Sequence, residues 1–173
     1  STKIEADHRE WTITLDAYDQ VISTGKSVVV IPHTRLRAPY VNKDGFRFEI
    51  YRRGFFSDVA KWFGAEDVEV DQQPFDEDFV IKGNNHAQLK ALFANEAIRN
   101  LLSAQPKVMF SVLDDEGWFG AKFPEGVDKL EFMVQGVIKD VGQLKSLYDL
   151  FAETLDHLCR IGSAYENDPQ VAL

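Results

Sequence analysis

The alternation of hydrophobic and polar residues changes its period near the middle of the chain. From Phe75 to Ile81 apolar residues alternate with polar ones, as on a strand with one buried face. Gly83-Asn84-Asn85 then interrupts the pattern, because Gly and Asn tolerate positive φ and Asn often caps helices. The segment therefore predicts a strand over residues 75–81 that ends in a turn leading to a helix.

Helical spacing follows this turn. Leu89, Leu92 and Phe93 share one face of a helix, and Asn95 followed by Glu96 predicts a second helix start. Pro106 prevents further helix beyond it. We therefore expect two short helices in tandem, and these helices need a sheet to pack on.

The N-terminal third is predicted to contain one helix and a hairpin. Apolar residues recur at helical spacing over Leu15–Ser23, and Gly25 follows as a stop, which favours a helix over the strand that the alternation around Trp11 would give. Residues 27–36 are rich in Val and Ile and predict a long strand. A turn over residues 42–45 should connect it to an alternating strand over 46–51, so that the two strands pair.

Further elements complete the pattern. They are a helix over residues 58–63 and strands over residues 67–71, 107–113, 118–123 and 130–137. The strands over 107–113 and 118–123 are expected to form a hairpin. Asp140 followed by Gln143 predicts a capped start for the longest helix, and Gly162 is its expected stop. Its apolar stripe consists of Val141, Leu144, Leu147, Leu150, Phe151, Leu155, Leu158 and Ile161.

These elements predict an α+β domain. About six strands should form a mostly antiparallel sheet, with helices packed on one face and a long helix at the C-terminus. Residues 1–173 read as a single domain whose ends, residues 1–10 and 163–173, are polar and expected to be frayed.

Composition narrows the possible functions. A net charge of -9 argues against nucleic acid as a partner and against broad attachment to anionic membranes. The single Cys159 excludes an internal disulfide and a multi-cysteine zinc site, and its helical apolar surroundings predict a buried, reduced thiol. No apolar run is long enough to span a membrane. The start at Ser1, without an initiator Met, predicts a processed or truncated product.

The strongest candidate for binding chemistry is a cluster of arginines. Arg35, Arg37, Arg47, Arg52 and Arg53 lie on the two strands expected to form the first hairpin, and converging guanidinium groups suit a carboxylate or phosphate ligand. Residues 66–78 carry seven carboxylates, however. We therefore favour a cross-strand lattice of salt bridges between these arginines and acids over an anion-binding site.

A second candidate is aromatic. Phe55, Phe56, Trp62 and Phe63 flank the short helix predicted over residues 58–63, where a core position is the simpler interpretation. If they are exposed, they form a docking patch for a partner or a membrane surface. No catalytic motif, calcium-loop spacing or histidine pair is present, and we predict no metal and no cofactor.

The stretch from Phe75 to Gly83, the two short helices and the strand from Lys107 resemble a bacterial domain family without known activity. Some members of that family follow transmembrane helices, so the resemblance implies that a membrane anchor could precede this chain in a longer parent. We expect a bacterial, cytoplasmic, non-enzymatic binding or scaffolding domain. The alternative is a hydrolase-like enzyme that holds an anionic substrate with the arginines and uses an acid of residues 66–78 as base.

Overall fold

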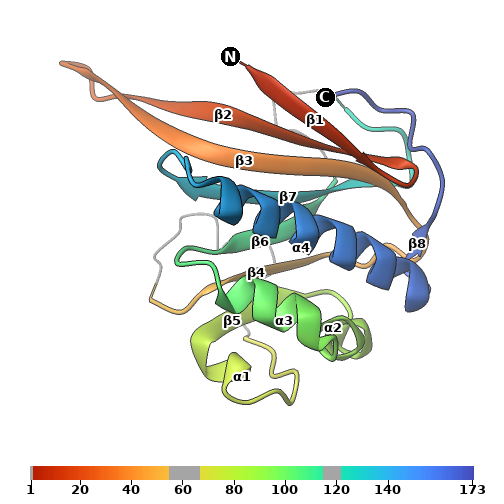
Figure 1. Ribbon diagram of the computed structural model, residues 1–173. Helices are drawn as coiled ribbons and strands as arrows, with labels where there is room; N and C mark the ends of the chain where they lie inside the picture. The colour runs from red at the N-terminus through yellow and green to blue at the C-terminus, as the bar shows by residue number, and fades with distance from the viewer. Residues whose placement is uncertain (1, 55–66, 115–121) are drawn as a thin grey trace.

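The computed structural model describes residues 2–54, 67–114 and 122–173, and these form an antiparallel sheet with helices on one face (Figure 1). The strands are β1 (Lys3–His8), β2 (Trp11–Ser23), β3 (Val28–Asn42), β4 (Phe48–Arg52), β5 (Phe79–Gly83), β6 (Met109–Leu113), β7 (Val127–Gln135) and β8 (Ala164–Tyr165). The helices are α1 (Phe75–Asp78), α2 (His86–Phe93), α3 (Glu96–Ser103) and α4 (Val141–Arg160). The α+β prediction is confirmed.

The strand order is β1-β2-β3-β7-β6-β4-β5, and β8 pairs with the end of β3. The core lies between the sheet and the helices, where phenylalanine rings from both layers meet. The ring of Phe110 on β6 lies 5.9 Å from that of Phe48 on β4 and 5.6 Å from that of Phe151 on α4. Edge-to-face contacts of this kind add to the free energy gained by burying the rings.

Three of the five predicted helix starts are confirmed. The side chain of Asn85 accepts a hydrogen bond from the Gln88 amide at the start of α2, and Asn95 and Asp140 cap α3 and α4 in the same way. The stripe of α4 is buried as predicted at its centre, but its first residue, Val141, is 65% exposed. None of the helices that the structure describes is both long enough and apolar enough to cross a membrane.

The helix predicted over Leu15–Ser23 is wrong, because this segment is part of β2. It pairs with β3 in a continuous register that ends at Ser23 opposite Val28. A helix gains stability by burying one apolar face, whereas Tyr18 and Ile22 are exposed here. Gly25 has a φ of +80° and lies in the turn between β2 and β3 instead of ending a helix.

The predicted pairing of residues 27–36 with 46–51 is also wrong. The turn over residues 42–45 exists, and the Asn42 side chain accepts from the amide of Gly45 at 2.9 Å. It carries the chain past β7 and β6, however, so β3 pairs with β2 and β7 while β4 pairs with β5 and β6. A turn signal specifies a reversal of the chain and not the strand that becomes the neighbour.

Several single segments also differ from the predicted elements. Residues 75–78 form α1, so the strand there begins at Phe79, and residues 67–71 are not a strand although the Val68 amide bonds to the carbonyl of Ile81. The N-terminal segment expected to be frayed forms β1, paired along its length with β2. The predicted helix over 58–63 and most of the strand over 118–123 lie outside the described residues.

Candidate functional site

A row of polar side chains crosses the sheet on the face turned away from the helices. Phe48 of β4 contacts Phe93 of α2, so the alternation of the strand directs Glu49 to the opposite face. Strand register aligns Glu49 with residues of six other strands, and side chains directly opposite each other on neighbouring strands share a face. The outermost of them, Glu5 on β1, is exposed and is left out of the row. The row consists of Thr14, Arg37, Glu131, Ser111, Glu49 and Lys82.

All six members of this row are buried, although the alternation of β4 predicted one buried face only. Two other buried charged groups adjoin the row on the same face, Asp16 and Lys129. The ammonium of Lys129 lies 3.1 Å from the carboxylate of Glu131. The middle of the face opposite the helices is therefore a second interior, in which six of the eight side chains are charged.

Two of the predicted arginines converge in this second interior. Arg35 and Arg37, two positions apart on β3, both donate to the carboxylate of Asp16, with N–O distances of 2.7 and 3.2 Å. Burial raises the pKa of Asp16, but hydrogen bonding from Arg35 and the charges of both arginines outweigh it and hold the pKa below its ordinary value. Asp16 therefore occupies the position between the guanidinium groups that an anionic ligand would take.

Glu49 has a different environment from Asp16. Its side chain is fully buried, and neither carboxylate oxygen has a hydrogen-bond partner among the residues that the structure describes. Burial raises the pKa of Glu49 to about 7, against the opposing effect of the positive charge of Lys82 on β5. A carboxyl group that titrates near neutral pH can donate or accept a proton under ordinary conditions. Sequence patterns gave no signal for it, since a Glu between two buried residues is typical of an exposed strand face.

The remaining three predicted arginines lie elsewhere and do not join Arg35 and Arg37. Arg47 pairs with Asp128 at 3.2 Å, and Arg53 pairs with Asp67 at 2.6 Å. Arg52 donates to backbone carbonyl groups and lies over the ring of Phe79. The structure therefore divides the predicted cluster among four places.

The acidic segment is largely occupied with its own backbone. Asp76 accepts from the amides of Val70 and Gln72, and Asp71 pairs with Lys90. Among the described residues, Arg53 pairs with an acid of this segment, Asp67. The lattice prediction is wrong for Arg47, because Arg47 pairs with Asp128.

No three described His, Cys, Asp or Glu side chains are arranged to hold a metal ion. The predicted docking patch at Phe55, Phe56, Trp62 and Phe63 lies outside the described residues.

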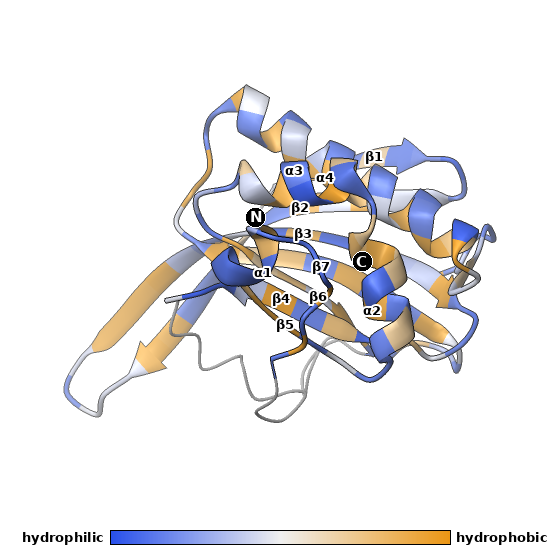
Figure 2. Ribbon diagram, turned by 90° about the horizontal axis from the view of Figure 1, so that it is seen from below, coloured by the Kyte–Doolittle hydropathy of each residue, from blue (hydrophilic) through white to orange (hydrophobic). Residues whose placement is uncertain are grey.

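A second candidate site projects from the sheet. Residues 17–32, called the arm below, comprise the end of β2 and the start of β3, and they extend beyond the rest of the sheet (Figure 1). Figure 2 shows that hydrophobic residues dominate this projection. Val21, Val28 and Val30 are 63%, 65% and 53% exposed. Register places these three on one face of the arm, while Ile22 opposite Val29 lies on the other.

The composition of the arm was visible in the sequence, but its position was not. Valines on both faces of residues 28–31 favour a strand in the middle of a sheet, because burial on both sides is the usual reason for such a run, whereas Pro32 favours an edge or a bulge for part of it. The structure instead leaves both faces exposed. The helix wrongly predicted over Leu15–Ser23 concealed the pairing that forms the arm.

Comparison of the chain with protein-family models, with curated proteins and with solved structures finds no match. The resemblance seen around residues 75–83 therefore stays a prediction, and the features that bear on function are the arm and the buried polar row.

Proposed function

We propose that the chain is a non-enzymatic binding module that holds another protein through the arm. The observation that carries this proposal is the exposure of aliphatic side chains on both faces of a two-stranded ribbon. Monomeric soluble proteins seldom expose contiguous apolar surface unless it binds something. A two-stranded ribbon is also marginally stable alone in water, so a partner that covers it would stabilise it.

The mode of binding that suits the arm is strand addition. Within the described part of the chain, β1 pairs with β2 only as far as Asp16, and β7 pairs with β3 only from His33 onward. Both edges of the arm therefore present backbone N–H and C=O groups. An extended apolar segment of a partner can bond to such an edge and pack its side chains on the exposed valines.

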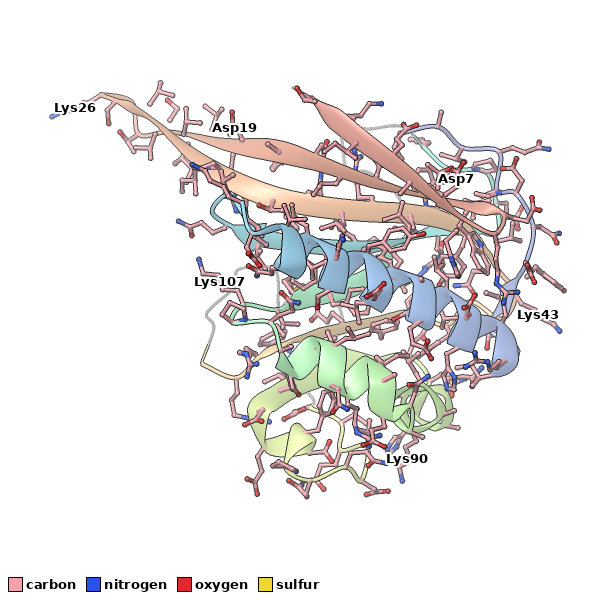
Figure 3. All side chains as sticks on the ribbon, in the orientation of Figure 1. Asp7, Asp19, Lys26, Lys43, Lys90 and Lys107 are labelled. Carbon is pink, nitrogen blue, oxygen red and sulfur yellow. The ribbon has the colours of Figure 1, made fainter. Side chains whose placement is uncertain are left out.

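Charge favours a protein partner over nucleic acid. Asp19 and Lys26, labelled in Figure 3, are the charged residues of the arm, so the arm is neutral in a chain of net charge -9. An apolar, neutral surface attracts neither phosphate groups nor anionic lipid headgroups. We place the module in the bacterial cytoplasm, as the sequence predicts.

A shortened arm tests this function. Gln20 and Ile31 are opposite each other, so replacing residues 21–30 with Asn-Gly closes the ribbon with a two-residue turn and removes the exposed valines. Immobilised wild-type chain should select β-branched apolar sequences from a library of random peptides displayed on phage, and the shortened chain should not. Equal enrichment on both chains, or none on either, would contradict the proposal.

The buried polar row favours a second candidate, a hydrolase-like enzyme for an anionic substrate. Glu49 would act as general acid or base, beside the positive charge of Lys82, its register partner on β5. Glu49 takes the place of the base that the sequence put in residues 66–78. Hydrolysis of p-nitrophenyl phosphate by the wild type, lost in Glu49→Gln, would support this candidate, and an equal background rate in both would argue against it.

A further inference from the structure

We infer that the arm's partner is a second copy of this chain, joined edge to edge through β2. The inference rests on the proposed function and names its partner. Two β2 strands would pair antiparallel across a two-fold axis, so that two ribbons form one four-stranded sheet. An antiparallel pair of identical strands always has this symmetry, because a residue before the centre of one strand lies opposite the residue equally far after the centre of the other.

The backbone directions decide which edge of the arm is used. The carbonyl of Pro32 on β3 accepts from the Gly136 amide, so it points away from β2. Asp19, opposite Pro32, therefore makes no ladder bond to β3, and its N–H and C=O point to the open edge of β2. By alternation the same holds for Val21 and Ser23.

This edge is better suited to pairing than the other one. The β2 side of the arm contains no proline, so every outward residue retains its N–H donor. The β3 side is interrupted by Pro32, which has no N–H and whose carbonyl is already bonded. A ladder along β2 can include Asp19, Val21 and Ser23, whereas one along β3 is limited to Val28 and Val30.

Side-chain pairing selects the centre of the interface. A centre at Asp19 would place two carboxylates opposite each other, which is unfavourable. A centre at Val21 places Val21 beside its counterpart and Asp19 beside Ser23 of the second copy, whose hydroxyl can donate to it. Since Val30 lies opposite Val21 within the arm, the pairing creates a row of four valines across the sheet.

The net charge of the chain makes this dimer dependent on salt concentration. Each copy carries a net charge of -9, whereas the arm is neutral. The bodies therefore repel one another while the interface itself brings together no net charge. Added salt screens the repulsion and should strengthen the association, unlike an association held by ion pairs.

The molar mass in solution tests the inference. Sedimentation velocity over a dilution series should show the 19.7 kDa monomer converting to a species of twice that mass, at lower concentration when salt is added. Val21→Pro removes an outward N–H without removing a bond to β3, and it should weaken dimerisation at least about tenfold. Val141→Pro is the matched control, because Val141 is equally exposed and stands at the first position of α4, where proline is tolerated.

Cross-linking tests the register independently of stability. In a Cys159→Ser background, Val21→Cys should form a covalent dimer under mild oxidation, since opposite residues of an antiparallel pair lie within disulfide range. Val28→Cys, equally exposed but on β3, should cross-link far more slowly. Equal rates would overturn the register.

Outcomes for the dimer and for the binding function are separable. A monomer at every concentration, or a dimer that survives Val21→Pro and the shortened arm, overturns the inference. If peptides are nevertheless selected by the wild-type arm, the binding function stands with a different partner. Failure of both experiments overturns both.

Discussion

Arg35 binds Asp16 through two separate hydrogen bonds, from Nε to Oδ1 at 2.9 Å and from Nη2 to Oδ2 at 2.7 Å. The two residues are direct register partners on β3 and β2, so the backbone ladder fixes the geometry of the ion pair. Arg37 adds a third hydrogen bond to the same carboxylate. A pairing between neighbouring strands thus places a carboxylate between two of the five arginines that the sequence offered as an anion site.

Removing this carboxylate should destabilise the fold. Asp16→Asn leaves two largely buried arginines without their shared counter-ion and should cost about 3 kcal/mol of unfolding free energy at pH 7. The folded-state pKa of Asp16 is lowered, so its contribution is full above the unfolded pKa and is lost as the pH falls through the folded one. The unfolding free energies of the two proteins, measured by urea denaturation, should therefore begin to converge as the pH falls below about 4.

Asp19→Asn is the control for this experiment. Asp19 lies on the same strand but is exposed, so its replacement should change the unfolding free energy by less than about 0.5 kcal/mol. A difference between wild type and Asp16→Asn that stays constant with pH would contradict the ion-pair interpretation.

Phosphate should not stabilise the wild type specifically. Since Asp16 occupies the position between Arg35 and Arg37, the melting temperature in phosphate should equal that in chloride at matched ionic strength. In Asp16→Ala the two guanidinium groups share no carboxylate at that position, and phosphate should raise the melting temperature by mass action. A phosphate-specific rise in the wild type that is lost in Arg35→Ala would show instead that an anion site exists there.

Glu49→Gln should reveal the raised pKa of the buried carboxyl group. Because the folded-state pKa of about 7 lies above the unfolded value, Glu49 costs no stability at low pH. The cost develops as the pH rises from the unfolded pKa to 7 and is complete above it, amounting to roughly 3 kcal/mol. The glutamine variant should therefore gain stability relative to wild type between pH 5 and 8 in urea denaturation. Parallel pH profiles would rule out a neutral Glu49.

The inner face of α4 should dominate the packing of helices on the sheet. Leu147→Ala and Phe151→Ala remove fully buried side chains and should each cost about 2–5 kcal/mol. Lys145→Ala, on the exposed face, should cost less than about 0.5 kcal/mol. Glu153 is a poorer control, because its carboxylate accepts a hydrogen bond from Asn95, the residue that caps α3, and its replacement would remove that contact. Equal losses at Leu147 and Lys145 would show that another face is buried.

The sequence by itself determined the features that depend on residues a few positions apart. Asn85, Asn95 and Asp140 cap helices because the amide that each one accepts from lies three residues ahead. The spacing of Arg35 and Arg37 likewise placed both on one face of a strand, which the shared contact with Asp16 confirms.

Tertiary structure decided which strands pair, and with that it decided both candidate sites. Asp16 meets Arg35 because β2 pairs with β3, and Glu49 meets Lys82 because β4 pairs with β5. Local pattern cannot select among strands of similar composition, since the free energy of pairing comes from contacts distant in sequence. It also could not reveal that the face bearing Glu49 is buried, or that the valines of the arm are exposed, because burial depends on the surrounding chain.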